Sequence, residues 1–466
     1  MNKKLLLVLV CVLVLAFALT ACNKGFKQDA VGGAELSKPV ENNGGLVVKQ
    51  GKHIYFINGY LGIDADNTFG TPYKTALMRA ELDVDGKIVE NSQVVIVPKN
   101  IYSASTTSGI YIYDGWIYYA TPNTELDKKG EVNTKYLDFM RTKIDATQTQ
   151  LLFTIDNRSV NFKFCNGFIS LFNGGDLYKI DLSAKKVNNE KNYVSVMNRI
   201  SGVKMICSDT NFGNFNLAVR NLPDEEAYKT YNELWAVSAD GSIQTKLIGG
   251  ATYDKSATPN TNNLFKIGLL NYVVESDGLT IYYTKTKTIG GTAQVVGLYS
   301  YKFTTLAELD PLKEKQLTYN TATTVTPISS EGGVLISESA RVILAKADAT
   351  GKPAELSNEQ KVVIDEAATV KFISNGFVYY TATSAPKAIY RIKLDGTGVE
   401  EKVFDVNPLT TWIDMELVGN YLYYIDSVTN YTHRYNIAGE LGKKPELVGK
   451  MTAEDAKKFA EADKKE

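Results

Sequence analysis

Side chains spaced for catalysis or metal binding are scarce in this sequence. Only two histidines occur in 466 residues, and each lies in a stretch with strand-like composition: His53 within residues 51–56 and His433 within residues 432–435. No G-x-S-x-G motif supplies a nucleophile. Metal hydrolases and histidine relays generally need more histidines than this. We therefore predict no catalytic residue, no metal site and no cofactor.

One acidic run begins like a calcium loop. Asp64 and Asp66 are correctly spaced, but Phe69 stands where such a loop has glycine, and the glutamate expected at the twelfth position is missing. The paired carboxylates of a glycoside hydrolase would come from distant segments, so spacing along the chain does not reveal them. Neither pattern overturns the prediction of a non-catalytic protein.

The overall composition excludes some functions. Lys and Arg number 51 against 52 Asp and Glu, a formal charge of −1, so the excess basic charge of a nucleic-acid-binding protein is missing. Hydrophobic residues make up 44% of the chain, which is enough for a large core. Tyrosine is unusually frequent, at 28 residues.

The N-terminus looks like an export signal. Lys3 and Lys4 precede an apolar run over residues 5–19, which is shorter than the ~20 residues of a membrane span. The run ends in Leu-Thr-Ala-Cys22, which resembles the lipobox of bacterial lipoproteins. The resemblance implies removal of residues 1–21 and acylation of Cys22. An ordinary signal peptide or anchor that happens to contain a cysteine is the alternative.

Residues 22–45 are polar and lack periodicity, so they predict a flexible tether. The predicted location is the bacterial cell envelope, outside the cytoplasm, with the chain held to the membrane by its lipid. Cys165 and Cys207 lie in apolar strand-like runs. Buried free thiols are the favoured interpretation, and a disulfide between adjacent repeat units is the alternative.

A repeated pattern fills the rest of the chain. Eight segments pair a glycine-containing turn with an apolar, aromatic strand, at intervals of about 44 to 65 residues; they begin at residues 51, 114, 166, 213, 277, 331, 375 and 419. Asn-Gly and Asp-Gly pairs, which suit tight hairpins, recur throughout. Residues 369–404 divide into four strands, near 369–373, 377–381, 388–394 and 401–404. The pattern predicts an all-β fold, a β-propeller over residues 46–448 with about eight four-stranded blades, seven being the alternative.

Paired tyrosines such as Tyr379 and Tyr380 invite a sugar-stacking role. Adjacent residues of a strand point to opposite faces of the sheet, and in a propeller both faces are covered by neighbouring blades. We therefore predict that the two members of each pair pack against different blades.

The segment from Asn375 to Val403 carries the clearest unit: Gly, a hydrophobic residue, Tyr-Tyr, a variable loop, then Tyr-Arg-Ile-x-x-Asp-Gly. It resembles a blade of the low-density-lipoprotein-receptor (YWTD) type of propeller, and in particular a bacterial group of undefined function. The units at 114, 277 and 419 match the first half well, whereas the fourth and sixth match poorly. The resemblance spans roughly residues 45–448 and implies a binding role without catalytic residues.

If the strands of each blade are lettered A to D from the axis outward, the B–C loops are long in units one, two, four and five. Loops that vary on a rigid scaffold often carry function, so we predict a binding face there, although such length also arises by drift. The candidate residues are Asp64, Asp66, Tyr73, Glu125, Asp127, Tyr136, Asp224, Glu225, Glu226, Tyr228 and Tyr231. Acidic and aromatic side chains of this kind suit a glycan, a basic peptide or calcium.

The predicted function is that of a membrane-anchored binding or scaffold module for a protein or glycan, present as a monomer. A cell-surface polysaccharide lyase or hydrolase built on a propeller is the alternative. A transporter-feeding, solute-binding lipoprotein would show an alternating α/β pattern, which is missing here. Residues 449–466 predict a charged tail, in which Thr452 and Asp455 form an N-cap signal for a short helix.

Overall fold

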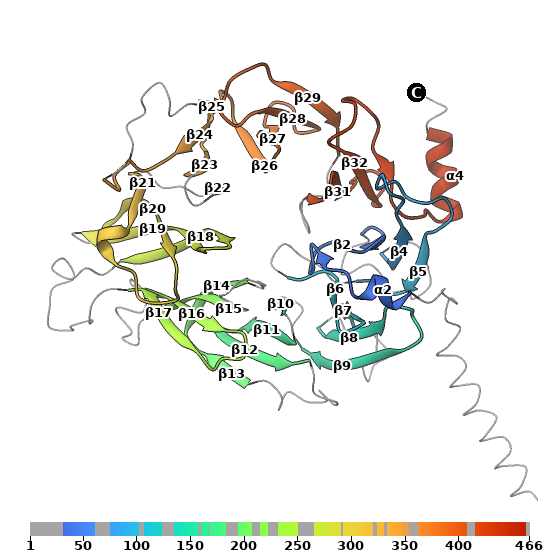
Figure 1. Cartoon of the computed structure of the whole chain (residues 1–466), viewed down its shortest axis with the longest axis horizontal. Helices are drawn as coiled ribbons and strands as arrows, with labels where there is room; N and C mark the ends of the chain where they lie inside the picture. The colour runs from blue at the N-terminus through green and yellow to red at the C-terminus, as the bar shows by residue number, and fades with distance from the viewer. Residues whose placement is uncertain are drawn as a thin grey trace, which may run out of the picture.

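A computed structural model of the chain confirms the predicted all-β propeller. Eight antiparallel sheets are arranged in a ring, each with four strands in sequence order apart from the first, which has five (Figure 1). The structure describes residues 31–60, 75–101, 107–123, 135–156, 160–165, 167–182, 194–206, 215–221, 232–249, 265–289, 292–319, 324–329, 333–348, 350–353, 362–407 and 415–462.

Blade 1 contains β1 (Val40–Glu41), β2 (Val47–Gln50), β3 (His53–Ile57), β4 (Leu77–Glu81) and β5 (Val94–Val97). Blade 2 contains β6 (Tyr111–Tyr113), β7 (Trp116–Pro122), β8 (Leu137–Lys143) and β9 (Thr149–Ile155). Blade 3 contains β10 (Asn161–Cys165), β11 (Phe168–Asn173), β12 (Asp176–Asp181) and β13 (Val194–Met197). Blade 4 contains β14 (Ile200–Ile206), β15 (Phe215–Asn221), β16 (Asn232–Ser238) and β17 (Gln244–Ile248). Blade 5 contains β18 (Lys266–Glu275), β19 (Gly278–Ile289), β20 (Thr292–Phe303) and β21 (Lys315–Thr318). Blade 6 contains β22 (Val325–Ser329), β23 (Gly333–Ser337), β24 (Val342–Ala345) and β25 (Val362–Ile364). Blade 7 contains β26 (Ala368–Ser374), β27 (Phe377–Ala382), β28 (Ala388–Lys393) and β29 (Glu401–Asp405). Blade 8 contains β30 (Glu416–Val418), β31 (Tyr421–Ile425), β32 (Thr432–Asn436) and β33 (Glu446–Leu447). The described helices are α2 (Gly33–Leu36), the 3-10 turn η2 (Pro311–Lys313) and α4 (Ala453–Ala462).

Residues suited to tight turns connect the strands at one end of the ring. We call it the A–B end, because the described A–B turns and the tight C–D turns lie there, and we call the opposite end the B–C end. In blade 7 the A–B turn is Asn375-Gly376, with φ of 50° and 77°, the positive values that a two-residue hairpin needs. In the C–D turn of that blade, Asp395 Oδ1 accepts hydrogen bonds from the backbone N (2.8 Å) and Oγ1 (2.6 Å) of Thr397. An aspartate closes the C–D turn in the same way at Asp83, Asp145, Asp240 and Asp348.

These turns make part of the stability pH-dependent. Hydrogen bonds from Ser238 and Ser242 lower the pKa of Asp240 from 3.8 to about 2. Because the folded-state pKa is depressed, the stabilisation from Asp240 is present above pH ~4 and is lost as pH falls towards 2. We expect Asp240→Ala to be less stable than wild type at pH 5 and to lose less stability on acidification. Urea unfolding between pH 5 and 2 measures this, and parallel pH curves for the two proteins would contradict it.

The tyrosine pairs pack as predicted. Tyr379 belongs to the core between blades 7 and 8, and Tyr380 to the core between blades 6 and 7. Both are at most 2% exposed. Tyr118 and Tyr119 likewise divide between the cores on either side of blade 2. The aromatic content therefore fills the spaces between blades.

No described blade combines strands from both ends of the chain. The strands of blade 1 all come from the N-terminal part and those of blade 8 from the C-terminal part. Side chains join them instead. The carboxylate of Glu416 on β30 accepts hydrogen bonds from the backbone N of Leu46 (2.8 Å) and Val47 (3.2 Å) and from Asn42 Nδ2 (2.7 Å). A Cβ at Gly45 would lie 2.6 Å from this carboxylate, so the contact requires glycine there. Burial raises the pKa of Glu416, against the lowering effect of its donors.

A second set of contacts closes the same junction at the B–C end. Thr432 Oγ1 donates to Ile57 O (2.5 Å), and the backbone N of Thr432 donates to Asn58 O (3.1 Å). The C-terminal segment covers this junction, where the Tyr431 hydroxyl donates to Asp455 of α4 (2.7 Å). The predicted N-cap is present, because Thr452 Oγ1 accepts from Asp455 N (3.1 Å). The tail is thus attached to the ring through its first helical turn (Figure 1).

The prediction of a free thiol at Cys165 is wrong. Cys165 ends β10, is 1% exposed and is disulfide-bonded. A buried thiol and a half-cystine occupy the same kind of apolar strand position, so the local sequence does not distinguish them.

Candidate functional site

The B–C end carries the predicted binding face, and most of its candidate residues lie outside the described residues. Tyr136 is the exception: it is partly exposed and directly precedes β8. Its carbonyl accepts a hydrogen bond from Asn123 N (3.1 Å), which joins the two ends of the B–C loop of blade 2. The lipidation candidate Cys22 and the other ten predicted face residues are outside the described ranges: Asp64, Asp66, Tyr73, Glu125, Asp127, Asp224, Glu225, Glu226, Tyr228 and Tyr231.

Two of the long loops leave from well-ordered polar anchors. In blade 2, Asn123 Nδ2 donates to both oxygens of Asp138 (2.9 and 3.0 Å), and Thr154 Oγ1 donates to the same carboxylate (2.6 Å). In blade 4, the side chain of Asn232 hydrogen-bonds both backbone groups of Ile267 in blade 5, at 2.6 and 3.1 Å. Buried polar networks that are satisfied in this way stiffen the base from which a loop projects.

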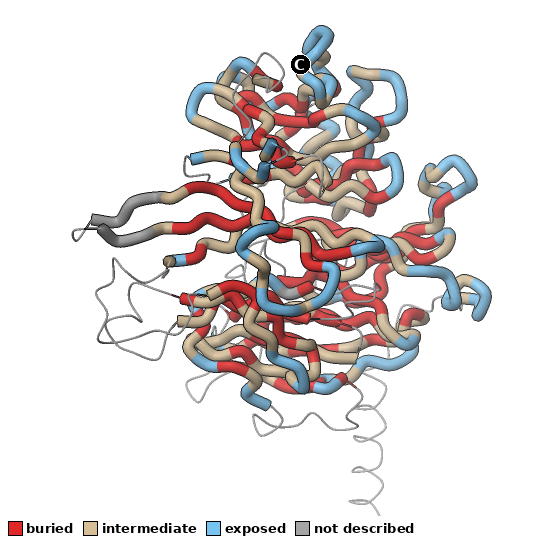
Figure 2. Tube along the Cα trace, turned by 60° about the vertical axis from the view of Figure 1, so that its left-hand side comes forward, coloured by how far each residue is buried: buried red, intermediate tan, exposed pale blue. Residues whose placement is uncertain are grey.

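The clearest feature of the B–C end is a hairpin in blade 5. β19 and β20 each have 12 residues, and no other described strand exceeds ten. β18 pairs with β19 only as far as Thr286, after which β19 and β20 continue as a two-stranded ribbon to the pair Ile289 and Thr292. The sequence predicted a long B–C loop in this unit, over residues 285–295. Its threonines and other β-branched residues instead extend the two strands. Figure 2 shows this hairpin standing out from the ring.

An ion pair holds the base of the hairpin. Lys285 Nζ lies 2.5 Å from the carboxylate of Glu314, and the two side chains are only 10% and 11% exposed. The Tyr283 hydroxyl donates to the same carboxylate. Burial, followed by the nearby charge of Glu314, raises the pKa of Tyr283 far above its usual range. One carboxylate therefore connects β19 to the segment that precedes β21.

Aromatic rings surround the Lys285 ammonium group. It lies 4.9 Å from the ring centroid of Phe265 and 4.4 Å from that of Tyr299. Cation–π attraction of this kind strengthens where water is excluded. Burial and the Glu314 charge raise the pKa of Tyr299 to about 12. On β20, a Cβ on Gly297 would lie 2.4 Å from Thr318 O. Only glycine therefore fits at this position, where a β-bulge shifts the register between β19 and β20.

Sequence reasoning missed this pair. Lys285 and Glu314 lie 29 positions apart, in a strand and in a C–D connection. No short motif brings them together. The available signal is Lys285 itself, a charged residue near the end of an otherwise apolar and Thr-rich strand.

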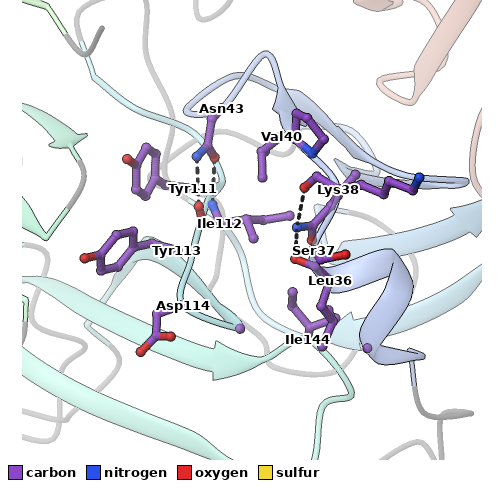
Figure 3. A pocket seen from close by; sticks show the side chains of 14 residues that line it. Leu36, Ser37, Lys38, Val40, Asn43, Tyr111, Ile112, Tyr113, Asp114 and Ile144 are labelled. Carbon is purple, nitrogen blue, oxygen red and sulfur yellow. Dashed lines mark hydrogen bonds between the residues drawn. The ribbon is translucent and has the colours of Figure 1, made fainter. Parts of the chain in front are cut away.

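A cavity of about 840 Å³ lies at the other end of the ring, between blade 2 and residues 33–40. Figure 3 shows Ile112 pointing between residues 36–40 and Ile144, whereas Tyr111 and Tyr113 point to the opposite side. Its amides are already engaged: Asn43 pairs with both backbone groups of Ile112 (2.7 and 2.8 Å), and Gln50 Nε2 donates to the carbonyls of residues 36 and 38. These polar groups hold the N-terminal segment, so the cavity is the weaker candidate for a ligand site.

Two features are missing from the described residues. They contain no group of three or more His, Cys, Asp or Glu side chains that could hold a metal ion. Within the same ranges, no helix is long and apolar enough to cross a membrane.

No protein-family model matches the chain, and none of the curated proteins matches it. Several solved structures are similar. AztD from Citrobacter koseri has 12% identity and a TM-score of 0.39, over 82% of this chain and 93% of that chain. Sqt1 from Saccharomyces cerevisiae has 10% identity and a TM-score of 0.39, over 85% and 94%. The polysaccharide lyase Uly1 has 11% identity and a TM-score of 0.37, over 82% and 91%. Similarity at this level does not transfer a function, and the fold assignment stands on the sheet topology of the chain itself.

Proposed function

We propose that this chain is an extracytoplasmic, lipid-anchored binding module that presents the B–C end of its propeller to a protein partner. The observation that carries the proposal is the blade 5 hairpin, which projects as a two-stranded ribbon from a base held by the buried Lys285–Glu314 pair. A rigid base keeps the ribbon in one orientation before binding, which lowers the entropy cost of association. Unpaired strand edges also offer backbone groups for pairing with another chain.

Two features support the location. The lipobox-like sequence at Cys22 implies acylation and export. The disulfide at Cys165 suits an oxidising compartment, because such bonds are rare in reducing cytoplasm. Cys207, which the sequence offers as the alternative disulfide partner in the adjacent unit, lies outside the described residues.

The resemblance of residues 375–403 to YWTD-type blades supports a binding role over an enzymatic one. In blade 7 the matching residues are structural: Tyr379 and Tyr380 are buried, and Arg391 Nε pairs with Glu401 (2.6 Å). We therefore propose membership of this propeller type, with the hairpin of blade 5 as the part that distinguishes this chain.

Shortening the hairpin tests the function. Replacing residues 287–294 by Asn-Gly keeps the Thr286–Val295 pair and closes the strands with a two-residue turn. We expect an unchanged thermal midpoint, an unchanged acylated N-terminal peptide, and at least tenfold weaker recovery of the partner after crosslinking in native membranes. Val84→Ser, a change at the opposite end, is the matched control and should recover the partner fully. Equal recovery by the shortened protein would contradict the proposal.

A further inference from the structure

The N-terminal segment joins the ring at the A–B end. We call residues 31–41 the strap. Gln50 Nε2 donates to the carbonyls of Leu36 (2.9 Å) and Lys38 (3.1 Å), and Glu35 accepts from the backbone N of Lys52 (2.7 Å) in the A–B turn of blade 1. β1 then pairs antiparallel with β2, with Val40 opposite Gln50. The chain therefore reaches the ring from the A–B end, although the sequence pattern assigns these residues to a free tether.

Chain length limits how far this end can lie from the membrane. Eight residues lie between Cys22 and Val31, the first described residue. Fully extended, the nine steps from Cys22 to Val31 span about 32 Å. An acyl group on Cys22 therefore holds the A–B end, where the strap joins the ring, within about this distance of the bilayer.

Exposed aliphatic side chains gather at the same end. Three C–D connections present one at or near their tips: Val84 (103% exposed), Ile243 (60%) and Val399 (86%). They come from blades 1, 4 and 7, so they are distributed around the ring. Among the other large hydrophobic residues of the described ranges that are exposed, Tyr319 and Val428 lie at the B–C end. Apolar side chains exposed at one end of a molecule suit contact with a membrane surface.

We propose that the A–B end lies on the bilayer surface, with the aliphatic tips of the C–D turns in contact with lipid. This rests on the lipid anchor of the proposed function and adds an orientation to it. The predicted mature charge is −3, so the contact depends on apolar burial and requires no anionic lipid. With this orientation the B–C end and its hairpin face away from the membrane, where a partner can reach them.

Depth-dependent fluorescence quenching tests the orientation in the full-length, acylated protein. An NBD label is attached to a single introduced cysteine at Val84, Ile243 or Val399, and the protein is reconstituted into vesicles of zwitterionic phosphatidylcholine carrying spin-labelled lipid. We expect at least twofold quenching at all three positions. Val428→Cys is the matched control at the B–C end, since Val428 is also an exposed valine in a turn (61%), and its label should stay unquenched.

The outcomes separate the orientation from the anchor. The acylated N-terminal peptide is identified by mass spectrometry in each sample. If acylation is present but the label at position 428 is quenched and the three others are not, the orientation is wrong and the anchor stands. Quenching at position 84 alone would mean that the ring stands on its edge, which also overturns the proposal. If the peptide carries no acyl group, the anchor itself fails.

Discussion

Replacing Glu416 by alanine is expected to lower the free energy of unfolding by about 3 kcal/mol, because it leaves the buried N–H groups of Leu46 and Val47 without an acceptor. The effect is large because this carboxylate joins β30, the innermost strand of the last blade, to the start of β2 in the first blade. Loss of the contact frees the N-terminal side of the junction, and the strap residues before it should become accessible to protease. Equilibrium urea unfolding and limited proteolysis measure the two effects.

Glu440→Ala is the matched control. Glu440 lies in the same blade, is 76% exposed and pairs with the equally exposed Lys443 at 2.9 Å. Exposed pairs of this kind contribute little, so the control should unfold like wild type. Equal stability of Glu416→Ala and Glu440→Ala would show that the ring is held closed by other contacts, such as that of Thr432 with Ile57.

The second large effect is expected for Glu314→Gln. Lys285 would keep its charge in an almost buried position with no carboxylate beside it, at a cost of about 3 kcal/mol. Because Lys285 lies under the hairpin, native-state hydrogen exchange should also become faster in β19 and β20. Urea unfolding gives the stability change, and exchange mass spectrometry locates it.

A second substitution checks the cause. Adding Lys285→Met to Glu314→Gln removes the unpaired charge and leaves an apolar chain among the aromatic rings of Phe265 and Tyr299. We expect the double variant to recover most of the lost stability, since apolar replacement of a buried ion pair is often close to neutral. Asp277→Asn, which breaks the exposed pair with Lys302 (2.7 Å) at the far end of the same sheet, should change little. If the double variant is as unstable as Glu314→Gln, the lost stability comes from the packing of Glu314 and not from the unpaired charge of Lys285.

The fold could be predicted because its determinants are local and repeated. The Asn375-Gly376 turn, the Tyr379-Tyr380 pair and the Asp395-Gly396 turn each carry their own backbone or packing preference. The four strands predicted within residues 369–404 agree with β26 to β29 to within two residues. Eight such units leave few alternatives to a closed ring.

The candidate site could not be predicted to the same extent. The Lys285–Glu314 pair and the Glu416 contacts join segments 29 and about 370 residues apart, and each depends on a single side chain with no repeated counterpart. The strap contacts likewise rest on single hydrogen bonds, one donated by Gln50 and one accepted by Glu35, and these leave no periodicity in a polar segment. The disulfide of Cys165 depends on which strands are neighbours, which follows only from the closed ring.

The central claim is that this propeller meets its partner through the B–C end. The most direct measurement is photo-crosslinking of the full-length protein in its own membrane, with a benzophenone amino acid at Thr288 of the hairpin or, separately, at Val84. We predict that position 288 crosslinks to one protein and that position 84 crosslinks to lipid. A single protein partner at position 84, with none at position 288, would contradict both the binding face and the orientation.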